Sequence, residues 1–191
     1  MKDYCIQHHG NWIGNMSIFI TGGSGLLGSK IAEIALEKRV HGIYAGYCHF
    51  KPEFGEPVKI DLAKNTDLAV IAQIKPDVII HTAALTNVDG CETNKELAYR
   101  INTEGTRRVA DIANELGAFL VYVSTDYVFS GDKGMYKEED DPNPINYYGY
   151  TKLLGEQYCS CIVRPCVIYG AKPASGTVNF ALWLIKNLSL K

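Results

Sequence analysis

The chain has 191 residues, of which 47% are hydrophobic and 21% charged, and its formal net charge is −2. This is the composition of an ordinary globular protein, and the length suffices to bury a core without disulfides or metals. The balanced charge and the lack of a Lys/Arg-rich run argue against nucleic acid or an anionic membrane surface as the main partner.

The sequence carries no pattern typical of a membrane span or a secreted protein. No apolar stretch approaches the roughly 18 residues needed to cross a bilayer. Residues 1–15 lack the continuous apolar centre of a signal peptide, and we interpret them as an N-terminal extension before Met16. We therefore expect a cytoplasmic protein.

The cysteines do not form a metal-binding pattern. None belongs to a C-x-x-C pair, and a structural zinc site needs about four convergent ligands. We expect reduced thiols and no metal site. The six residues are Cys5, Cys48, Cys91, Cys159, Cys161 and Cys166.

Strand-like and helix-like segments alternate along the chain. Apolar runs predict strands at 17–21, 43–47, 57–60, 77–82, 119–124 and 161–167, and apolar spacing predicts helices at 26–38, 66–74, 94–116, from about 146, and at 177–187. This alternation favours right-handed crossovers and a parallel sheet with helices on both faces. We predict an α/β fold, a Rossmann-type doubly wound parallel sheet over residues 16–170.

A glycine-rich turn joins the first predicted strand to the first predicted helix. Its spacing is Gly22-x-x-Gly25-x-x-Gly28, which permits a tight turn, a close approach of backbone to a pyrophosphate, and close packing of helix on sheet. Leu26 and Leu27 open the helix, whose free N–H groups attract phosphate. The strand before and the helix after the motif favour dinucleotide binding over a plain flexible turn.

The end of the second predicted strand bears on the choice of dinucleotide. An NAD site usually has an acidic residue there to bind the ribose hydroxyls, whereas this strand runs into Tyr47-Cys48-His49-Phe50-Lys51. His49 and Lys51 are candidates for contact with a 2′-phosphate, although a solvated loop would also explain them. We expect NADPH as the cofactor, and NADH remains an alternative.

Tyr148 and Lys152 are the candidate catalytic pair. Four residues apart at the start of a predicted helix, they lie on one face, one turn apart. A nearby ammonium favours the phenolate and is expected to lower the pKa of the tyrosine toward the working range. Such a pair also occurs by chance on solvated helices, but its place after the fifth strand favours catalysis. Thr125, at the end of that strand, can offer a hydroxyl to a carbonyl oxygen.

Several segments in order resemble those of a known family. They are TGGSGLLG (21–28), HTAALTNVDGCE (81–92), YRINTEGT (99–106), VSTDYVFSG (123–131), YYGYTKLLGE (147–156) and IVRPCVIYG (162–170). Together they look like the extended short-chain dehydrogenases, specifically the dTDP-4-dehydrorhamnose reductases. The resemblance implies reduction, by NADPH or NADH, of the C4 keto group of a dTDP-4-dehydro-6-deoxy sugar.

The resemblance also implies roles for individual residues. Tyr148 would protonate the keto oxygen, Lys152 would hold the nicotinamide ribose, and Thr125 would complete the triad. The resemblance implies further cofactor contacts for Asp61, Leu62, Thr82, Ala83, Ala84 and Thr86. It also implies that Val88, Asp89 and Glu92 belong to a loop that lines the active site.

Three other polar residues are expected to serve the structure. Asn102 matches a family asparagine that ties the central helix to the active-site strand. Asp126 is interpreted as structural rather than as a catalytic acid. His81 lies inside an apolar strand and is expected to be a packed core histidine rather than a ligand.

The sequence departs from the family in two respects. Family members are longer and build a substrate domain from the additional residues, so residues 171–191 are interpreted as the start of a truncated substrate-binding region. Only eleven residues separate Lys152 from Arg164, fewer than in the family, so the catalytic helix is expected to be short. A fragment of a longer reductase is favoured over a truncated cofactor-binding module.

Two other functions and one assembly state remain open. A sugar-nucleotide epimerase or dehydratase would use the same scaffold. A non-catalytic, NADP-binding regulatory subunit of methionine adenosyltransferase would share the dinucleotide fold and even the Tyr/Lys pair. A homodimer is compatible with the sequence.

Overall fold

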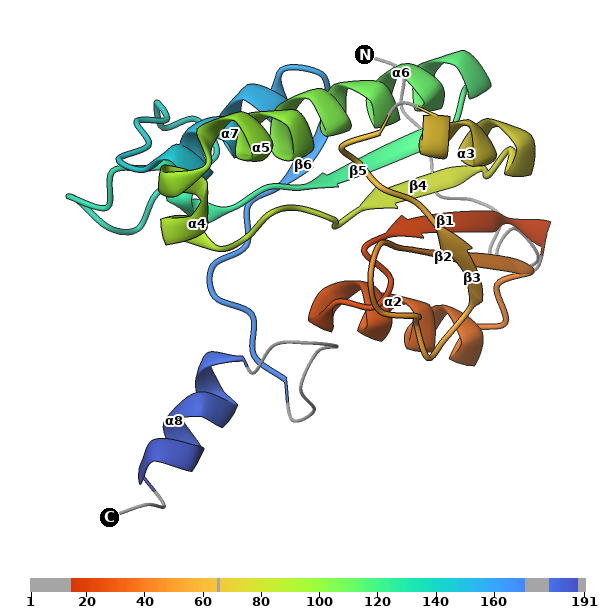
Figure 1. Cartoon of the computed structure of the whole chain (residues 1–191), viewed down its shortest axis with the longest axis horizontal. Helices are drawn as coiled ribbons and strands as arrows, with labels where there is room; N and C mark the ends of the chain where they lie inside the picture. Colours follow the sequence, from red (N-terminus) through yellow and green to blue (C-terminus); the bar gives the residue numbers. More distant parts are fainter. Residues whose placement is uncertain (1–14, 65, 171–178, 189–191) are drawn as a thin grey trace.

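The computed structural model describes residues 15–64, 66–170 and 179–188 (Figure 1). Six parallel strands form one sheet in the order β3-β2-β1-β4-β5-β6. They are β1 (Ser17–Thr21), β2 (Gly42–Tyr47), β3 (Glu56–Lys59), β4 (Val78–His81), β5 (Phe119–Val123) and β6 (Cys161–Val163). The strand order reverses between β1 and β4, which opens a crevice at their carboxyl ends. The prediction of a Rossmann-type fold is confirmed.

Helices cover both faces of the sheet. Figure 1 shows α2 on one face and α3, α5, α6 and α7 on the other. The α-helices are α2 (Leu26–Glu37), α3 (Ala69–Ile74), α4 (Val88–Thr93), α5 (Lys95–Tyr99), α6 (Thr106–Leu116), α7 (Tyr147–Glu156) and α8 (Phe180–Leu188). Shorter elements are the 3₁₀ turns η1 (Thr66–Leu68) and η3 (Asp126–Val128) and the π-helical segment η2 (Arg100–Gly105).

Alternation along β1 divides the core into two layers. Ile18 and Ile20 pack with Ala32 of α2 on one face, while Phe19 packs with Val109 of α6 on the other. This is the period of two expected for a strand buried on both sides. The central strand is thus fixed from both faces, and the carboxyl ends beside it are held in place.

The structure corrects the prediction in two places. The segment expected to be a loop around Val88 forms the helix α4, because the Asn87 side chain accepts a hydrogen bond from the Gly90 N–H at 2.7 Å and caps it. The sixth strand ends at Val163 rather than at residue 167. Its partner β5 ends at Val123, after which the chain turns into η3.

The ends of the chain are described only in part. The proposed extension 1–15 and the region 171–191 lie largely outside the described residues, as does the beginning of the predicted helix at residue 177. The described α8 buries none of its side chains. No helix in residues 15–64, 66–170 and 179–188 is long and apolar enough to cross a membrane.

Candidate active site

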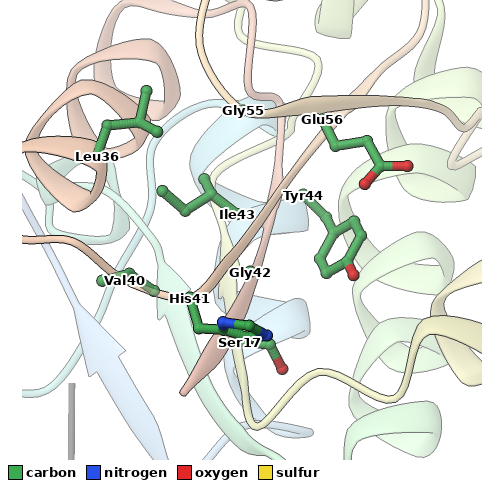
Figure 2. A pocket seen from close by; sticks show the side chains of 9 residues that line it. All are labelled: Ser17, Leu36, Val40, His41, Gly42, Ile43, Tyr44, Gly55 and Glu56. Carbon is green, nitrogen blue, oxygen red and sulfur yellow. The ribbon is translucent and has the colours of Figure 1, made fainter. Parts of the chain in front are cut away.

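A cleft of about 1040 Å³ lies at the carboxyl ends of the central strands. It contains most of the residues predicted to bind cofactor or substrate, namely Gly22, Gly25, Leu26, Leu27, Gly28, His49, Asp61, Leu62, Thr82, Ala83, Ala84, Thr86, Val88, Thr125, Tyr148 and Lys152. Lys51 and Asp89 are exposed and lie outside this lining. A smaller hollow around His41 and Glu56, at the other end of β2, contains none of the predicted residues (Figure 2).

The glycine turn leaves no space for side chains. A Cβ on Gly22, whose φ is +69°, would lie 2.9 Å from Thr82 Oγ1. A Cβ on Gly28 would lie 2.3 Å from the Gly22 carbonyl oxygen. Gly25 is the N-cap of α2 and supplies no side-chain cap. The first turn of α2 therefore faces the cleft with backbone N–H groups, which is the arrangement that binds phosphate.

The loop after β3 lines part of the cleft. Asp61 accepts a hydrogen bond from the Ala63 N–H at 2.9 Å, which fixes the turn. The Arg108 guanidinium of α6 donates to the Leu62 carbonyl oxygen. His49, just after β2, also lines the cleft. The two hydrogen bonds fix the conformation of the loop after β3.

Tyr148 occupies the first turn of α7 and is buried. Two acceptors fix this helix N-terminus: Asn146 Oδ1 accepts from the Gly149 N–H at 2.8 Å, and Glu92 Oε1 from the Tyr147 N–H at 2.6 Å. Sequence reasoning put Glu92 in a loop lining the active site, whereas the structure shows it on α4, capping α7. The cap explains why a ten-residue helix can present Tyr148 in a fixed position.

The electrostatics of Tyr148 differ from the prediction. Burial raises the pKa of Tyr148, and the nearby Thr125 hydroxyl acts in the opposite direction. The Lys152 ammonium donates to the Val123 carbonyl oxygen at 2.7 Å and lies 4.2 Å from the centre of the Tyr122 ring. Burial lowers the pKa of Lys152 to about 7. The expectation that Lys152 brings the pKa of Tyr148 down is therefore wrong for this arrangement.

The residues expected to be structural have well-defined partners. His81 is fully buried between the Thr21 and Thr106 hydroxyls, at 2.7 and 3.0 Å. Burial, and secondarily the charge of Lys152, lower the pKa of His81 to about 3, so the ring is neutral at physiological pH. The prediction of a packed core histidine is confirmed.

Asn102 links two walls of the site, as the resemblance implied. Its side chain accepts from the Leu85 N–H at 2.8 Å and donates to the Thr151 hydroxyl at 3.1 Å. It thereby joins the segment after β4 to α7 through the π-helical segment. Asp126 accepts a hydrogen bond from the Thr125 hydroxyl at 3.2 Å, which agrees with a structural role.

Some lining residues were not singled out from the sequence. Tyr127 is 42% exposed, lines the cleft, and its ring lies edge-on to that of Tyr148 at 5.8 Å. Its position two residues after Thr125 could have identified it, because it lies in the turn that ends β5. Ser24, Phe50 and Leu85 also line the cleft, and nothing in their local pattern distinguishes them.

The thiols remain unpaired in the described part of the chain. Cys48, Cys91, Cys159, Cys161 and Cys166 are free, and Cys5 lies outside the described residues. Within those residues no group of three or more His, Cys, Asp or Glu side chains is arranged to hold a metal ion.

Comparisons with known proteins bear on the choice between a reductase and a regulatory subunit. Residues 16–188 match the family model described as RmlD substrate binding domain. Methionine adenosyltransferase 2 subunit beta from Bos taurus is 35% identical over 164 residues, which cover 83% of this chain and 48% of that protein.

Solved structures give a similar result. A hypothetical dTDP-4-dehydrorhamnose reductase from Sulfolobus tokodaii is 40% identical, with a TM-score of 0.80 over 90% of this chain and 61% of its own. The dTDP-4-dehydrorhamnose reductase from Bacillus anthracis, solved in complex with NADP, is 35% identical, with a TM-score of 0.78 over 93% and 61%. The chain spans about half of the bovine protein (48%) and three fifths (61%) of these two.

Proposed function

The chain belongs to the RmlD family of extended short-chain dehydrogenases, and from that premise we propose that it carries the cofactor site and the acid–base residues of an NADPH-dependent reductase. The substrate is the C4 keto group of a dTDP-4-dehydro-6-deoxy sugar. One observation carries the proposal: the Tyr148 phenol and the Thr125 hydroxyl face the same cleft as the glycine turn at the start of α2.

The described residues fit a bound dinucleotide. The backbone N–H groups of the turn at Gly22, Gly25 and Gly28 would hold the pyrophosphate, which can approach closely because no side chain fits at Gly22 and Gly28. Asp61 and Leu62 would border the adenine, and His49 the 2′-phosphate. When bound, NADPH supplies the hydride that reaches the carbonyl carbon.

The chain's own residues handle the proton. Tyr148 donates its phenolic proton to the keto oxygen, which becomes the product hydroxyl. When substrate binds, the Thr125 hydroxyl turns its one proton from Asp126 to the same oxygen and stabilises the charge that develops there. The raised pKa of Tyr148 keeps the phenol protonated at neutral pH, as a general acid requires. Lys152 lies one turn further along α7, where it would hold the nicotinamide ribose.

A non-catalytic role is the second candidate, and the similarity to methionine adenosyltransferase 2 subunit beta supports it. A regulatory subunit would bind the cofactor in the same cleft and act by contact with a partner enzyme. Dinucleotide affinity alone therefore does not discriminate between the two candidates, and turnover does.

The decisive experiment measures NADPH and NADH oxidation with a panel of dTDP- and UDP-4-keto sugars, for the wild-type chain and for Tyr148→Phe. The reductase predicts oxidation stoichiometric with substrate, which Tyr148→Phe abolishes while cofactor affinity remains. Turnover unchanged in Tyr148→Phe would refute the assignment. A tightly bound, recycled nicotinamide that copurifies would indicate an epimerase or dehydratase instead. Capture of a methionine adenosyltransferase catalytic subunit, with no turnover of any sugar, would favour the regulatory role.

A further inference from the structure

Gly149, between Tyr148 and Tyr150 in the first turn of α7, lies in unusually close contact with another backbone segment. A Cβ at this position would lie 2.1 Å from the carbonyl oxygen of Tyr127 and 2.9 Å from its carbonyl carbon. Carbon atoms normally pack at about 3.5–4.0 Å. The first turn of α7 therefore rests directly on the backbone of η3, and only glycine permits this contact.

The segment beneath Gly149 is the one that carries Thr125. Thr125 is the N-cap of η3, and its hydroxyl accepts a hydrogen bond from the Tyr127 N–H at 3.2 Å. The same hydroxyl lines the cleft together with the Tyr148 phenol and acts to lower the pKa of that phenol. Gly149 thus follows Tyr148 in sequence and contacts the turn that carries Thr125. The separation of α7 and η3 sets the distance between the two hydroxyl groups.

We propose that Gly149 is a positioning residue: its missing side chain sets the spacing of α7 and η3, and with it the distance between the Thr125 and Tyr148 hydroxyl groups. This inference rests on the proposed reductase function for its effect on turnover. Its effect on the Tyr148–Thr125 contact is a property of the free chain.

Gly149→Ala is the direct test. The added methyl must move η3 and α7 apart by about 1 Å to restore ordinary contact distances, and a displacement of that size near reacting groups costs about 100-fold in rate. We expect kcat to fall by about that factor, while the Kd for NADPH stays within about threefold of wild type, because the glycine turn lies on α2.

Gly155→Ala is the matched control on the same helix. A Cβ at Gly155 would lie 2.7 Å from the Tyr122 hydroxyl and 2.9 Å from the Asn102 carbonyl oxygen, so it strains the packing of α7 two turns away from Thr125. Both substitutions also raise helix propensity equally. A positioning role requires that Gly149→Ala lowers kcat at least tenfold more than Gly155→Ala does.

A titration separates positioning from general damage and needs no substrate. The Tyr148 phenol is followed by NMR of tyrosine labelled with ¹³C at Cζ, with Tyr148→Phe for assignment. Because the Thr125 hydroxyl opposes the effect of burial on the phenol, moving it away should raise the pKa of Tyr148 further in Gly149→Ala. Thr125→Val should produce the same rise, and the double variant should show no further change.

A second variant covers the case in which Gly149→Ala fails to fold. Asn146→Ala removes the acceptor that holds the Gly149 N–H at 2.8 Å and adds no atoms, so it loosens the same turn; it should raise the pKa of Tyr148 and lower kcat several-fold. The inference is overturned if whichever of the two variants folds has the Tyr148 pKa and the kcat of the wild type. It is also overturned if the pKa changes caused by that variant and by Thr125→Val add in full. If the wild-type chain turns over no sugar, the titration still decides the role of Gly149, and only the proposed function fails.

Discussion

Replacing Lys152 by methionine should stabilise the folded chain at neutral pH. Lys152 is only 2% exposed, and burial lowers its pKa from 10.5 to about 7. The folded chain therefore binds the proton less tightly than the unfolded chain, in which Lys152 titrates near its ordinary pKa. Below the unfolded pKa of 10.5 this difference destabilises the fold, increasingly as pH falls, and it is complete below the folded pKa of about 7.

The magnitude follows from the shift and from the contacts that Lys152 makes. A pKa difference of about 3.5 corresponds to about 5 kcal/mol at low pH. The hydrogen bond to the Val123 carbonyl oxygen and the contact with the Tyr122 ring together return about 2–4 kcal/mol. Methionine fills a similar volume without a charge. The free energy of unfolding should therefore rise by about 1–3 kcal/mol in Lys152→Met at pH 7.

Urea denaturation followed by circular dichroism between pH 6 and 10 measures this difference. The advantage of Lys152→Met should shrink as pH rises from 7 toward 10, because the wild-type fold recovers the free energy that the buried charge costs. Lys59→Met, an exposed lysine on β3, is the control and should change stability by less than about 0.5 kcal/mol. If Lys152→Met is less stable than wild type at pH 7, or if its advantage does not depend on pH, the reasoning is refuted.

Three other substitutions test the cleft and its support. Gly28→Ala should abolish NADPH binding in calorimetry, because the added Cβ would lie 2.3 Å from the Gly22 carbonyl oxygen; a Kd within threefold of wild type would contradict this. Ser124→Ala should raise the free energy of unfolding by about 1 kcal/mol, because within the described residues the buried Ser124 hydroxyl has no hydrogen-bond partner, and destabilisation in urea would show that the hydroxyl is satisfied. Glu156→Ala should cost about 3 kcal/mol, because it leaves the half-buried Arg164 guanidinium without the carboxylate that it contacts at 2.7 and 3.0 Å; a loss below 1 kcal/mol in urea unfolding would argue against this.

Local sequence patterns predicted the parts of the site that depend on local geometry. The glycine turn was predictable because each glycine answers a steric demand within one strand–turn–helix unit. The positions of Tyr148 and Lys152 on one helix follow from their spacing of four. The helix α4 was not predictable from apolar periodicity, because a side-chain cap from Asn87 begins it and the six residues contain little apolar pattern.

Contacts between distant segments could not be derived from the sequence. The direction of the Lys152 side chain depends on the Val123 carbonyl oxygen and the Tyr122 ring, which come from another element. The spacing alone suggested an ammonium close to the phenol and a lowered pKa of Tyr148. Burial decides the outcome, and burial is a property of the packed fold.

The charged side chains of the cleft suit the binding of the cofactor better than the binding of a sugar nucleotide. Among the described lining residues the basic side chains are His49 and Lys152, and the acidic ones are Asp61 and Asp126. Backbone N–H groups at the glycine turn can neutralise one diphosphate, that of the dinucleotide. A nucleotide sugar brings a second diphosphate, for which these residues offer no further cation. NADPH binding is therefore the property that these residues support by themselves, and sugar-nucleotide affinity should be the weaker of the two. Turnover at high substrate concentration, with a KM well above the Kd for NADPH, is the kinetic pattern that this distribution of charge predicts.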